Sequence, residues 1–300
     1  MRRLLPLLLV AACAPEQAVD EVSRDPVVVY AAFEEDPALT GLFDRYTEAT
    51  GVVVMHRYGK PEAIVDDLVR NDVLPPADLL MTRSAVDIWR AAEESALRPL
   101  YSEVVAGRVP DWARDTDDLW FATSADIAVV AYNPKQLEGE AIAFSSLAEP
   151  GFAGKLCLSS SKNSINRAVI ALMISASDVR QAELTVRGWV GNLAAPPFAT
   201  EAELAAEIAA GNCAVGVVSR SVAENIGDLE IRRPDVTIAT IDAIGIGRHA
   251  RNPDGAVSLI EWLFDELPAI DTAEIAPIDA SIPAWNAEDA RKLAERARYH

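Results

Sequence analysis

Cysteine and histidine are scarce in this chain of 300 residues, which contains only three of each. The histidines, His56, His249 and His300, are far apart in the sequence, and no Cys-x-x-Cys motif occurs. Zinc sites use clustered Cys and His ligands, and a cysteine nucleophile needs a basic partner. The composition therefore argues against a zinc enzyme and a cysteine–histidine catalytic site. No other nucleophile–base pair stands out, so we expect no enzyme and no cofactor.

Basic residues are also few: the chain has 27 Lys and Arg residues and 46 Asp and Glu residues. The formal net charge is −19. Binding to nucleic acid needs a basic stripe, and binding to an anionic membrane surface needs basic clusters. We therefore expect neither partner. A large net charge of one sign keeps a secreted protein in solution, and it is compatible with cationic cargo without implying it.

No apolar run is long enough to span a bilayer, which takes about 20 residues as a helix. A short apolar run at 4–12 follows two arginines and precedes Cys13, which is the layout of a secretory signal. The letters VAAC before and at Cys13 resemble a bacterial lipobox, whose cysteine carries lipid after cleavage. We expect a signal peptide at 1–12, a lipidated Cys13 with a tether at 13–25, and a location in the periplasm or at the cell surface. A plain cleaved signal is the alternative.

From residue 26 onward, strand and helix patterns alternate. In the first part, short apolar strands are predicted at 27–30, 52–55 and 78–81, and amphipathic helices at 37–50, 62–73 and 84–95. This rhythm predicts a parallel sheet that is covered on both faces.

The rhythm repeats in a second part, after a longer predicted strand at 127–132. Two further strands, at 236–241 and 243–246, are placed to return the chain to the first part. The sequence therefore predicts an α/β fold with two lobes, hinge strands and an interlobe cleft. The ranges are 26–118 with 237–268 for lobe 1, and 119–236 with 269–300 for lobe 2.

Two cysteines remain once Cys13 is assigned to the lipid. Cys157 and Cys213 form an even pair in an oxidising compartment, and each lies in a predicted core strand of lobe 2. We predict a disulfide between them, which requires Cα atoms within about 7 Å.

Three predicted turns follow a strand and precede a helix, and each carries hydroxyl and basic side chains. They are Thr82-Arg83-Ser84, 159–164 and Ser219-Arg220-Ser221. Hydroxyl groups and free helix N–H groups bind anions, and arginine adds bidentate recognition. Ordinary helix capping by serine is the alternative. We predict that six residues line one cleft: Glu34, Arg83, Ser160, Lys162, Arg220 and Ser221.

Three acidic residues, Glu34, Glu35 and Asp36, directly follow the first strand. Carboxylates at this position suit a hard cation, so Glu34 and Glu35 are candidate metal ligands. The alternative is that they stabilise the next helix, and Asp36 before Pro37 has the pattern of an N-cap.

Several phrases in the chain, taken in order, resemble the ferric-iron substrate-binding proteins of bacterial ABC importers. The phrases are FDRYTEATGV (43–52), PADLLMT (76–82), WF (120–121), AYN (131–133), GKLCLSSSKNSIN (154–166), RGWVGNLAAPPF (187–198), GNCAVGVV (211–218) and NPDGAVSLIEWL (252–263). The resemblance covers nearly all of the chain that follows the signal. It implies a monomeric periplasmic binding protein with two lobes that passes a small solute to an ABC permease in the inner membrane.

The residues that hold iron in this family are replaced here. The family's adjacent tyrosine pair falls on Ser221 and Val222, and a further tyrosine falls on Ile165. The His or His-Tyr near the first strand falls on Glu34-Glu35, and an anion-holding arginine falls near Ala128. Three hypotheses therefore stand: a binder of ferric iron or another metal with a changed ligand set, a binder of a phosphorylated or carboxylated solute, and a sensor or interaction lipoprotein whose pocket has degenerated.

Overall fold

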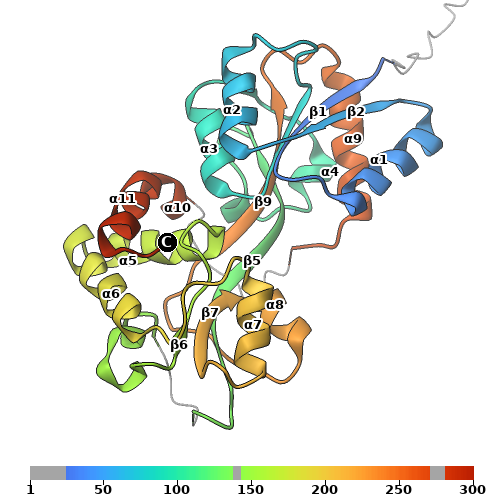
Figure 1. The fold of residues 1–300 in the computed structure, drawn as a ribbon. Helices are drawn as coiled ribbons and strands as arrows, with labels where there is room; N and C mark the ends of the chain where they lie inside the picture. The colour runs from blue at the N-terminus through green and yellow to red at the C-terminus, as the bar shows by residue number, and fades with distance from the viewer. Residues whose placement is uncertain (1–24, 138–142, 271–280) are drawn as a thin grey trace, which may run out of the picture.

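A computed structural model describes residues 25–137, 143–270 and 281–300 of the chain. Its helices and strands form two lobes with separate hydrophobic cores, joined by the strands β5 (Phe121–Tyr132) and β9 (Ala239–Gly247) (Figure 1). The predicted signal peptide and Cys13 with most of its tether lie outside the described residues. Within the described ranges, no helix combines the length and the apolar content that crossing a membrane requires.

Lobe 1 begins with strands and helices in alternation, as the sequence predicts. The strand β1 pairs in parallel with both β2 and β3. The helix α1 has clear local causes, because the Asp36 carboxylate accepts hydrogen bonds from two N–H groups of its first turn, and Gly51 ends it at a φ of 75°. The elements of this lobe are β1 (Val27–Ala32), α1 (Pro37–Thr50), β2 (Val54–Tyr58), α2 (Pro61–Arg70), β3 (Leu79–Thr82), α3 (Ala85–Glu93), β4 (Leu97–Arg98), α4 (Glu103–Ala106) and α9 (Pro253–Glu266).

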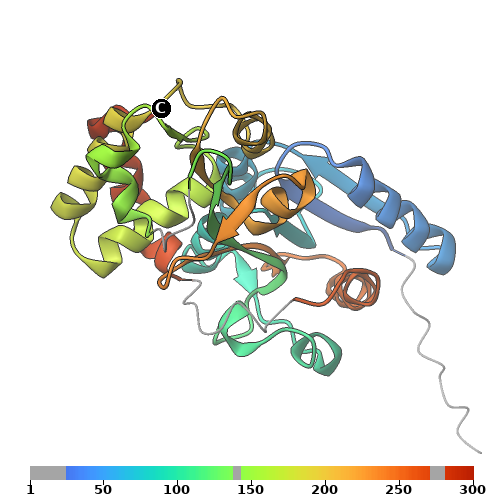
Figure 2. The ribbon, with the colours of Figure 1, turned by 90° about the horizontal axis from the view of Figure 1, so that it is seen from below.

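Lobe 2 contains the middle of the chain and its C-terminal helices. Its core surrounds the fully buried Trp189, whose indole N–H donates to the carbonyl of Phe144 at 2.9 Å. The elements are β5 (Phe121–Tyr132), β6 (Leu156–Cys157), α5 (Ser164–Ala176), α6 (Val179–Asn192), α7 (Glu201–Ala209), β7 (Val215–Ser219), α8 (Arg220–Ile226), β8 (Glu230–Arg232), α10 (Ile282–Trp285) and α11 (Ala287–Ala297). In the view from below, the red C-terminal helices lie on the opposite side of the molecule from the blue β1, β2 and α1 (Figure 2).

The strands β5 and β9 (Ala239–Gly247) run from one lobe into the other (Figure 1). Ala122 and Ile241 belong to the core of lobe 1, whereas Ile127 and Ala239 belong to the core of lobe 2. The cores therefore divide inside these two paired strands, a few residues beyond the boundaries at 118/119 and 236/237 that the sequence suggests.

Two details of the predicted sheet are wrong. The strands at 236–241 and 243–246 are a single strand, β9, which continues through Asp242. The sheet is also not purely parallel: β9 pairs antiparallel with β3 and β5, and β5 pairs antiparallel with β7. The order of the main strands is β2-β1-β3-β9-β5-β7-β6. Antiparallel hinge strands allow the chain to leave lobe 1 along β5 and to return along β9.

The predicted disulfide is confirmed, because Cys157 and Cys213 are bonded with a Cα–Cα distance of 5.9 Å. Cys157 ends β6, and Cys213 lies just before β7, the strand parallel to β6. Both residues are buried in the core of lobe 2. The bond therefore links two neighbouring strands inside one lobe and leaves the hinge free.

Candidate functional site

A cavity of about 490 Å³ lies between the two lobes. Lobe 1 contributes the starts of α2 and α3, and lobe 2 contributes the start of α5 with Pro283 of α10. Thr240 of the hinge strand β9 also lines the cavity. The volume is in the range of sites for small organic ligands. A molecule bound here would touch both lobes and the hinge.

The first turns of three helices face this cavity. Pro61 and Glu62 begin α2, Ala85 and Val86 begin α3, and Ser164 begins α5. Unpaired N–H groups at a helix start attract negative charge. At α3 the Ser84 hydroxyl accepts from one such N–H, whereas α5 begins without a side-chain cap. The backbone therefore favours an anion in this cavity.

Four basic side chains line the same cavity: Lys60 and Arg83 from lobe 1, and Lys162 and Arg167 from lobe 2. Within the described part of the chain, the side chains of Lys60, Lys162 and Arg167 form no ion pair and no hydrogen bond. Unpaired cations at one cleft are notable in a chain of net charge −19. They focus a positive potential where a solute binds.

Arg83 differs from the other three because it is already paired. Its guanidinium bonds the Asp36 carboxylate and lies over the Phe33 ring, 4.6 Å from the ring centroid. Burial raises the pKa of Asp36, but the N–H groups of Leu39 and Ala38 and the guanidinium outweigh it and hold the pKa below its ordinary value. Arg83 is therefore anchored by an ionised carboxylate at the hinge side of the cavity.

Arg83 also lines a second, smaller cavity of about 190 Å³, beside Ser124 of β5 and Asp242 of β9. Burial raises the pKa of Asp242, against the lowering effects of Arg83 and of a hydrogen bond from Ser124. The basic group predicted at position 83 is thus part of the hinge as well as of the cleft.

Two carboxylates, Glu62 on α2 and Asp87 on α3, line the main cavity opposite the basic groups of α5. The pKa of Asp87 is raised to about 6, first by burial and then by the charge of Glu62, while Arg167 and the Ser84 hydroxyl lower it. Arg167 acts on Asp87 from the other lobe, so α3 and α5 face each other across the cavity.

The raised pKa of Asp87 has a consequence for stability. The folded protein holds the Asp87 proton more tightly than the unfolded chain does, so ionisation of Asp87 removes stability as the pH rises from about 4 through 6. Asp87→Asn is therefore expected to raise the free energy of unfolding by about 1–3 kcal/mol at pH 7.5, and by about half as much at pH 5. Urea unfolding at both values checks this. A destabilised variant at pH 7.5, or a gain that does not depend on pH, would contradict it.

Of the six residues predicted to share one cleft, Arg83 and Lys162 line the main cavity and the other four lie outside its lining. Ser160 lies in the same turn as Lys162, and its hydroxyl accepts the Lys162 N–H at 3.3 Å. Glu34 and Glu35 are exposed in the turn between β1 and α1.

Arg220 and Ser221 are engaged elsewhere, at the start of α8. The Ser221 hydroxyl and its N–H, the latter at 3.2 Å, both donate to Asp126 of the hinge strand β5. The Arg220 Nε lies 3.9 Å from the Glu224 carboxylate, one turn along the same helix. Arg220 and Ser221 therefore do not line this cavity, and that the third strand-end turn faces the same cleft stays a prediction.

The structure offers no assembled metal site among the described residues, where no three His, Cys, Asp or Glu side chains form a group that suits an ion. Ile165, at the position of a family iron ligand, and Ala128, near the position of the anion-holding arginine, are buried in the core of lobe 2. Asp36 is the N-cap of α1, as the alternative interpretation proposed. Glu34 and Glu35 remain candidates only as exposed carboxylates.

Tyr58 and His56 lie on the edge strand β2, close to the predicted acidic turn. The Tyr58 hydroxyl is 2.9 Å from the Thr40 hydroxyl and donates to the Asp36 carbonyl at 3.3 Å. Burial raises the pKa of Tyr58, and the carboxylates of Asp36 and Glu35 act in the same direction. The His56 ring packs against those of Phe43 and Tyr58. Both residues therefore have structural partners, and Tyr58 disfavours the phenolate form.

Four charged residues of the cavity were missed by the sequence analysis: Lys60, Glu62, Asp87 and Arg167. Lys60 follows the end of a strand, so the rule that selected Arg83 would have selected it if the end of β2 had been placed correctly. Arg167 lies one turn beyond Asn163, on a helix start that was already singled out. Nothing in the sequence separates Asp87 from other acidic residues on helix surfaces.

The sequence model of the bacterial extracellular solute-binding protein family matches residues 27–266. Among characterised proteins, "Iron uptake protein A1" of Synechocystis is 25% identical over 245 residues, which are 75% of this chain and 67% of that protein.

Solved structures share the fold at lower identity. The ferric binding protein from Campylobacter jejuni superimposes with a TM-score of 0.79 at 20% identity, covering 91% of this chain and 100% of that one. The periplasmic binding protein AfuA from Actinobacillus pleuropneumoniae, with fructose-6-phosphate bound, gives a TM-score of 0.70 at 15% identity and covers 93% and 100% of the two chains. Both are α/β periplasmic binding proteins, which agrees with the fold class that the sequence predicts.

Proposed function

Because this chain belongs to the bacterial extracellular solute-binding protein family, we propose that it captures a small organic anion, carrying a phosphoryl or carboxylate group, between its lobes. Members of this family bind solutes and are not enzymes, and they generally serve ABC transporters. The partner proposed here is an ABC permease of the inner membrane, which receives the solute.

The observation that carries the proposal is a set of cations around one interlobe cavity, Lys60, Lys162 and Arg167, which form no ion pair with any residue in 25–137, 143–270 and 281–300. The helix starts of α2, α3 and α5 add partial positive charge at the same place. Arginine and helix N–H groups are the donors that proteins use for phosphoryl and carboxylate groups. A retained cavity with such donors speaks against a degenerate pocket.

The same residues argue against ferric iron as the cargo, although relatives are named for it. Hard cations need anionic oxygen ligands, whereas this cavity carries four basic groups and two carboxylates. A phosphorylated cargo is compatible with the fold, since AfuA is described with fructose-6-phosphate bound.

Ferric citrate is therefore expected to leave the purified protein without the red-orange absorption band that iron–phenolate bonds produce. Ser221, Val222 and Ile165 cannot supply a phenolate, and Tyr58 is hydrogen-bonded with a raised pKa. A visible absorption spectrum checks this. A band that appears in the wild type and disappears in Tyr58→Phe would contradict the proposal and identify Tyr58 as an iron ligand.

The direct test is calorimetric titration at low ionic strength with ethyl phosphate, propionate and ferric citrate in separate runs. We expect heat of binding with at least one of the two organic anions, weakening as salt is added because the attraction is electrostatic. Saturable binding of ferric citrate with no binding of either organic anion would overturn the proposal.

We also propose that the protein is a monomer, tethered through a lipidated Cys13 outside the cytoplasm. The support is the charged, apolar and small-residue layout of 1–12 and the lipobox-like letters before Cys13. A Cys13→Ser variant is expected to move from the membrane fraction to the aqueous fraction of lysed cells. Equal distribution of the two proteins would refute the anchor.

A further inference from the structure

Both signs of charge line the interlobe cavity: lobe 2 contributes only cations, whereas lobe 1 contributes Glu62 and Asp87 together with Lys60 and Arg83. Resting on the function proposed above, we propose that the solute is a zwitterion: its anionic group binds the start of α5, and a protonated amine binds between Glu62 and Asp87. The ligand class is therefore a small amino-phosphate, amino-phosphonate or amino acid. A simple organic anion would leave Glu62 and Asp87 without a group of opposite charge.

The charged residues of the cavity come from both lobes. Lys162, in the turn before α5, and Arg167 of α5 line the cavity from lobe 2. Both carboxylates, Glu62 of α2 and Asp87 of α3, line it from lobe 1, which also contributes Lys60 and Arg83. Neither carboxylate forms an ion pair in the described part of the protein, and neither do the two cations. Opposite charges that are held apart across a cavity leave room for a ligand of matching polarity.

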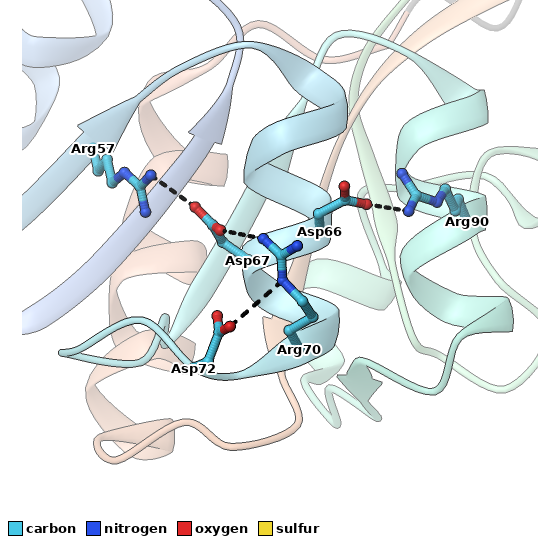
Figure 3. A network of polar contacts seen from close by, with 6 residues as sticks. All are labelled: Arg57, Asp66, Asp67, Arg70, Asp72 and Arg90. Carbon is cyan, nitrogen blue, oxygen red and sulfur yellow. Dashed lines mark hydrogen bonds and ion pairs between the residues drawn. The ribbon is translucent and has the colours of Figure 1, made fainter.

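The carboxylate wall is held in place by an ion pair outside the cavity. Asp66 of α2 bonds Arg90 of α3, as Figure 3 shows. Glu62 lies one turn before Asp66 on α2, and Asp87 lies one turn before Arg90 on α3. Residues three or four apart share one face of a helix. The pair therefore sets the spacing of α2 and α3 where both carboxylates face the cavity.

A second ion-pair cluster supports α2 from its outer side. Asp67 accepts from Arg57 at 2.7 Å and from Arg70 at 3.0 Å, and Arg70 lies 3.6 Å from Asp72 (Figure 3). These ion pairs neutralise charged side chains of α2 that do not line the cleft. Among the residues that the structure describes, Glu62 forms no ion pair and no hydrogen bond, as expected of a carboxylate that binds a ligand.

The raised pKa of Asp87 also supports an amine site between the two carboxylates. Burial and the charge of Glu62 raise the pKa of Asp87 to about 6, so the Asp87 carboxylate lies in an environment that disfavours its negative charge. A protonated amine placed between the two carboxylates would stabilise this charge and donate charge-assisted hydrogen bonds. A water molecule or a hydroxyl group would gain less, because it carries no charge.

The test uses two matched pairs of probes that differ by the amine alone: phosphoethanolamine with ethyl phosphate, and β-alanine with propionate. By calorimetry at pH 7.5, the amine is expected to tighten binding by about tenfold or more in at least one pair. The double variant Glu62→Gln/Asp87→Asn should lose this preference while it still binds the probe without an amine. Asp44→Asn/Glu48→Gln, with the same charge change on the exposed face of α1, should keep it.

The outcomes separate the two proposals. Equal affinity within both pairs in the wild type would overturn the zwitterion and leave the anion site standing. No binding of any of the four probes would overturn both. A preference that persists in the double variant would place the amine elsewhere and refute the role of Glu62 and Asp87. If the double variant does not fold, the single change Glu62→Gln at an exposed position should already reduce the preference.

Discussion

Replacing Lys162 and Arg167 together with glutamine is expected to weaken binding of the organic anion on the order of 100-fold or more. Both residues belong to the wall of lobe 2 and have no ion-pair partner among the described residues. A hydrogen bond to a charged group contributes about 1.5–3 kcal/mol, and each 1.4 kcal/mol is a factor of about ten in affinity. Calorimetric titration with the tightest-binding probe measures the loss.

The matched control removes the same charges from a different place in lobe 2. Lys155 and Arg180 are exposed and lie outside the lining of the cavity, so Lys155→Gln/Arg180→Gln should lower the affinity only slightly, through the general field. Equal losses in the two double variants would mean that net charge, and not contact at α5, determines binding.

Removing the disulfide is expected to have the largest effect on stability. Cys157 and Cys213 are 56 residues apart, and closing a loop of this length corresponds to about 4 kcal/mol in the chain-entropy account. Cys157→Ala/Cys213→Ala should therefore lower the free energy of unfolding by about 2–4 kcal/mol. Both cysteines belong to the core of lobe 2, so the loss should be confined mainly to that lobe.

Hydrogen exchange read by mass spectrometry distinguishes the lobes. Amides of β6 and β7 should exchange faster in the variant, whereas amides of β1 and β3 should be nearly unchanged. Reduction of the wild type should reproduce the pattern, which controls for the lost side-chain volume. Unchanged exchange in lobe 2 after reduction would show that the bond does not stabilise it.

The sequence was a good guide to the lobes because hydrophobic periodicity records which faces are buried. The runs at 27–30 and 78–81 are fully or nearly buried in β1 and β3. The hydrophobic pattern gave a wrong strand boundary where a polar residue lies inside a strand. Asp242 suggested a break, yet β9 continues through it, since Asp242 pairs with Ser124 of β5 at the hinge.

The register of β2 explains one missed site residue. The apolar letters VVVM suggested a strand at 52–55, but pairing with β1 places it at Val54–Tyr58, with Val53 half exposed. An edge strand is decided by its partner's hydrogen bonds more than by its own apolar content. The true end of β2 brings Lys60 to the cavity, two residues further along.

The sequence predicted only part of the candidate site. Arg83 and Lys162 follow strand ends, and the rule for ligand sites in α/β sheets found them. The same rule selected Arg220, whose surroundings on β5 and α8 the sequence does not reveal. Asp87 and Arg167 line the same cavity from different lobes, and no local sequence pattern encodes proximity between residues so far apart in the chain.

The central claim is that the interlobe cavity binds an organic zwitterion through charges from both lobes. A crystal structure of the protein grown with phosphoethanolamine tests it most directly. The phosphoryl group should lie within hydrogen-bond distance of Arg167 and the start of α5, with the amine between Glu62 and Asp87. A phosphoryl group found outside this cavity, or an amine that points away from both carboxylates, would contradict the account.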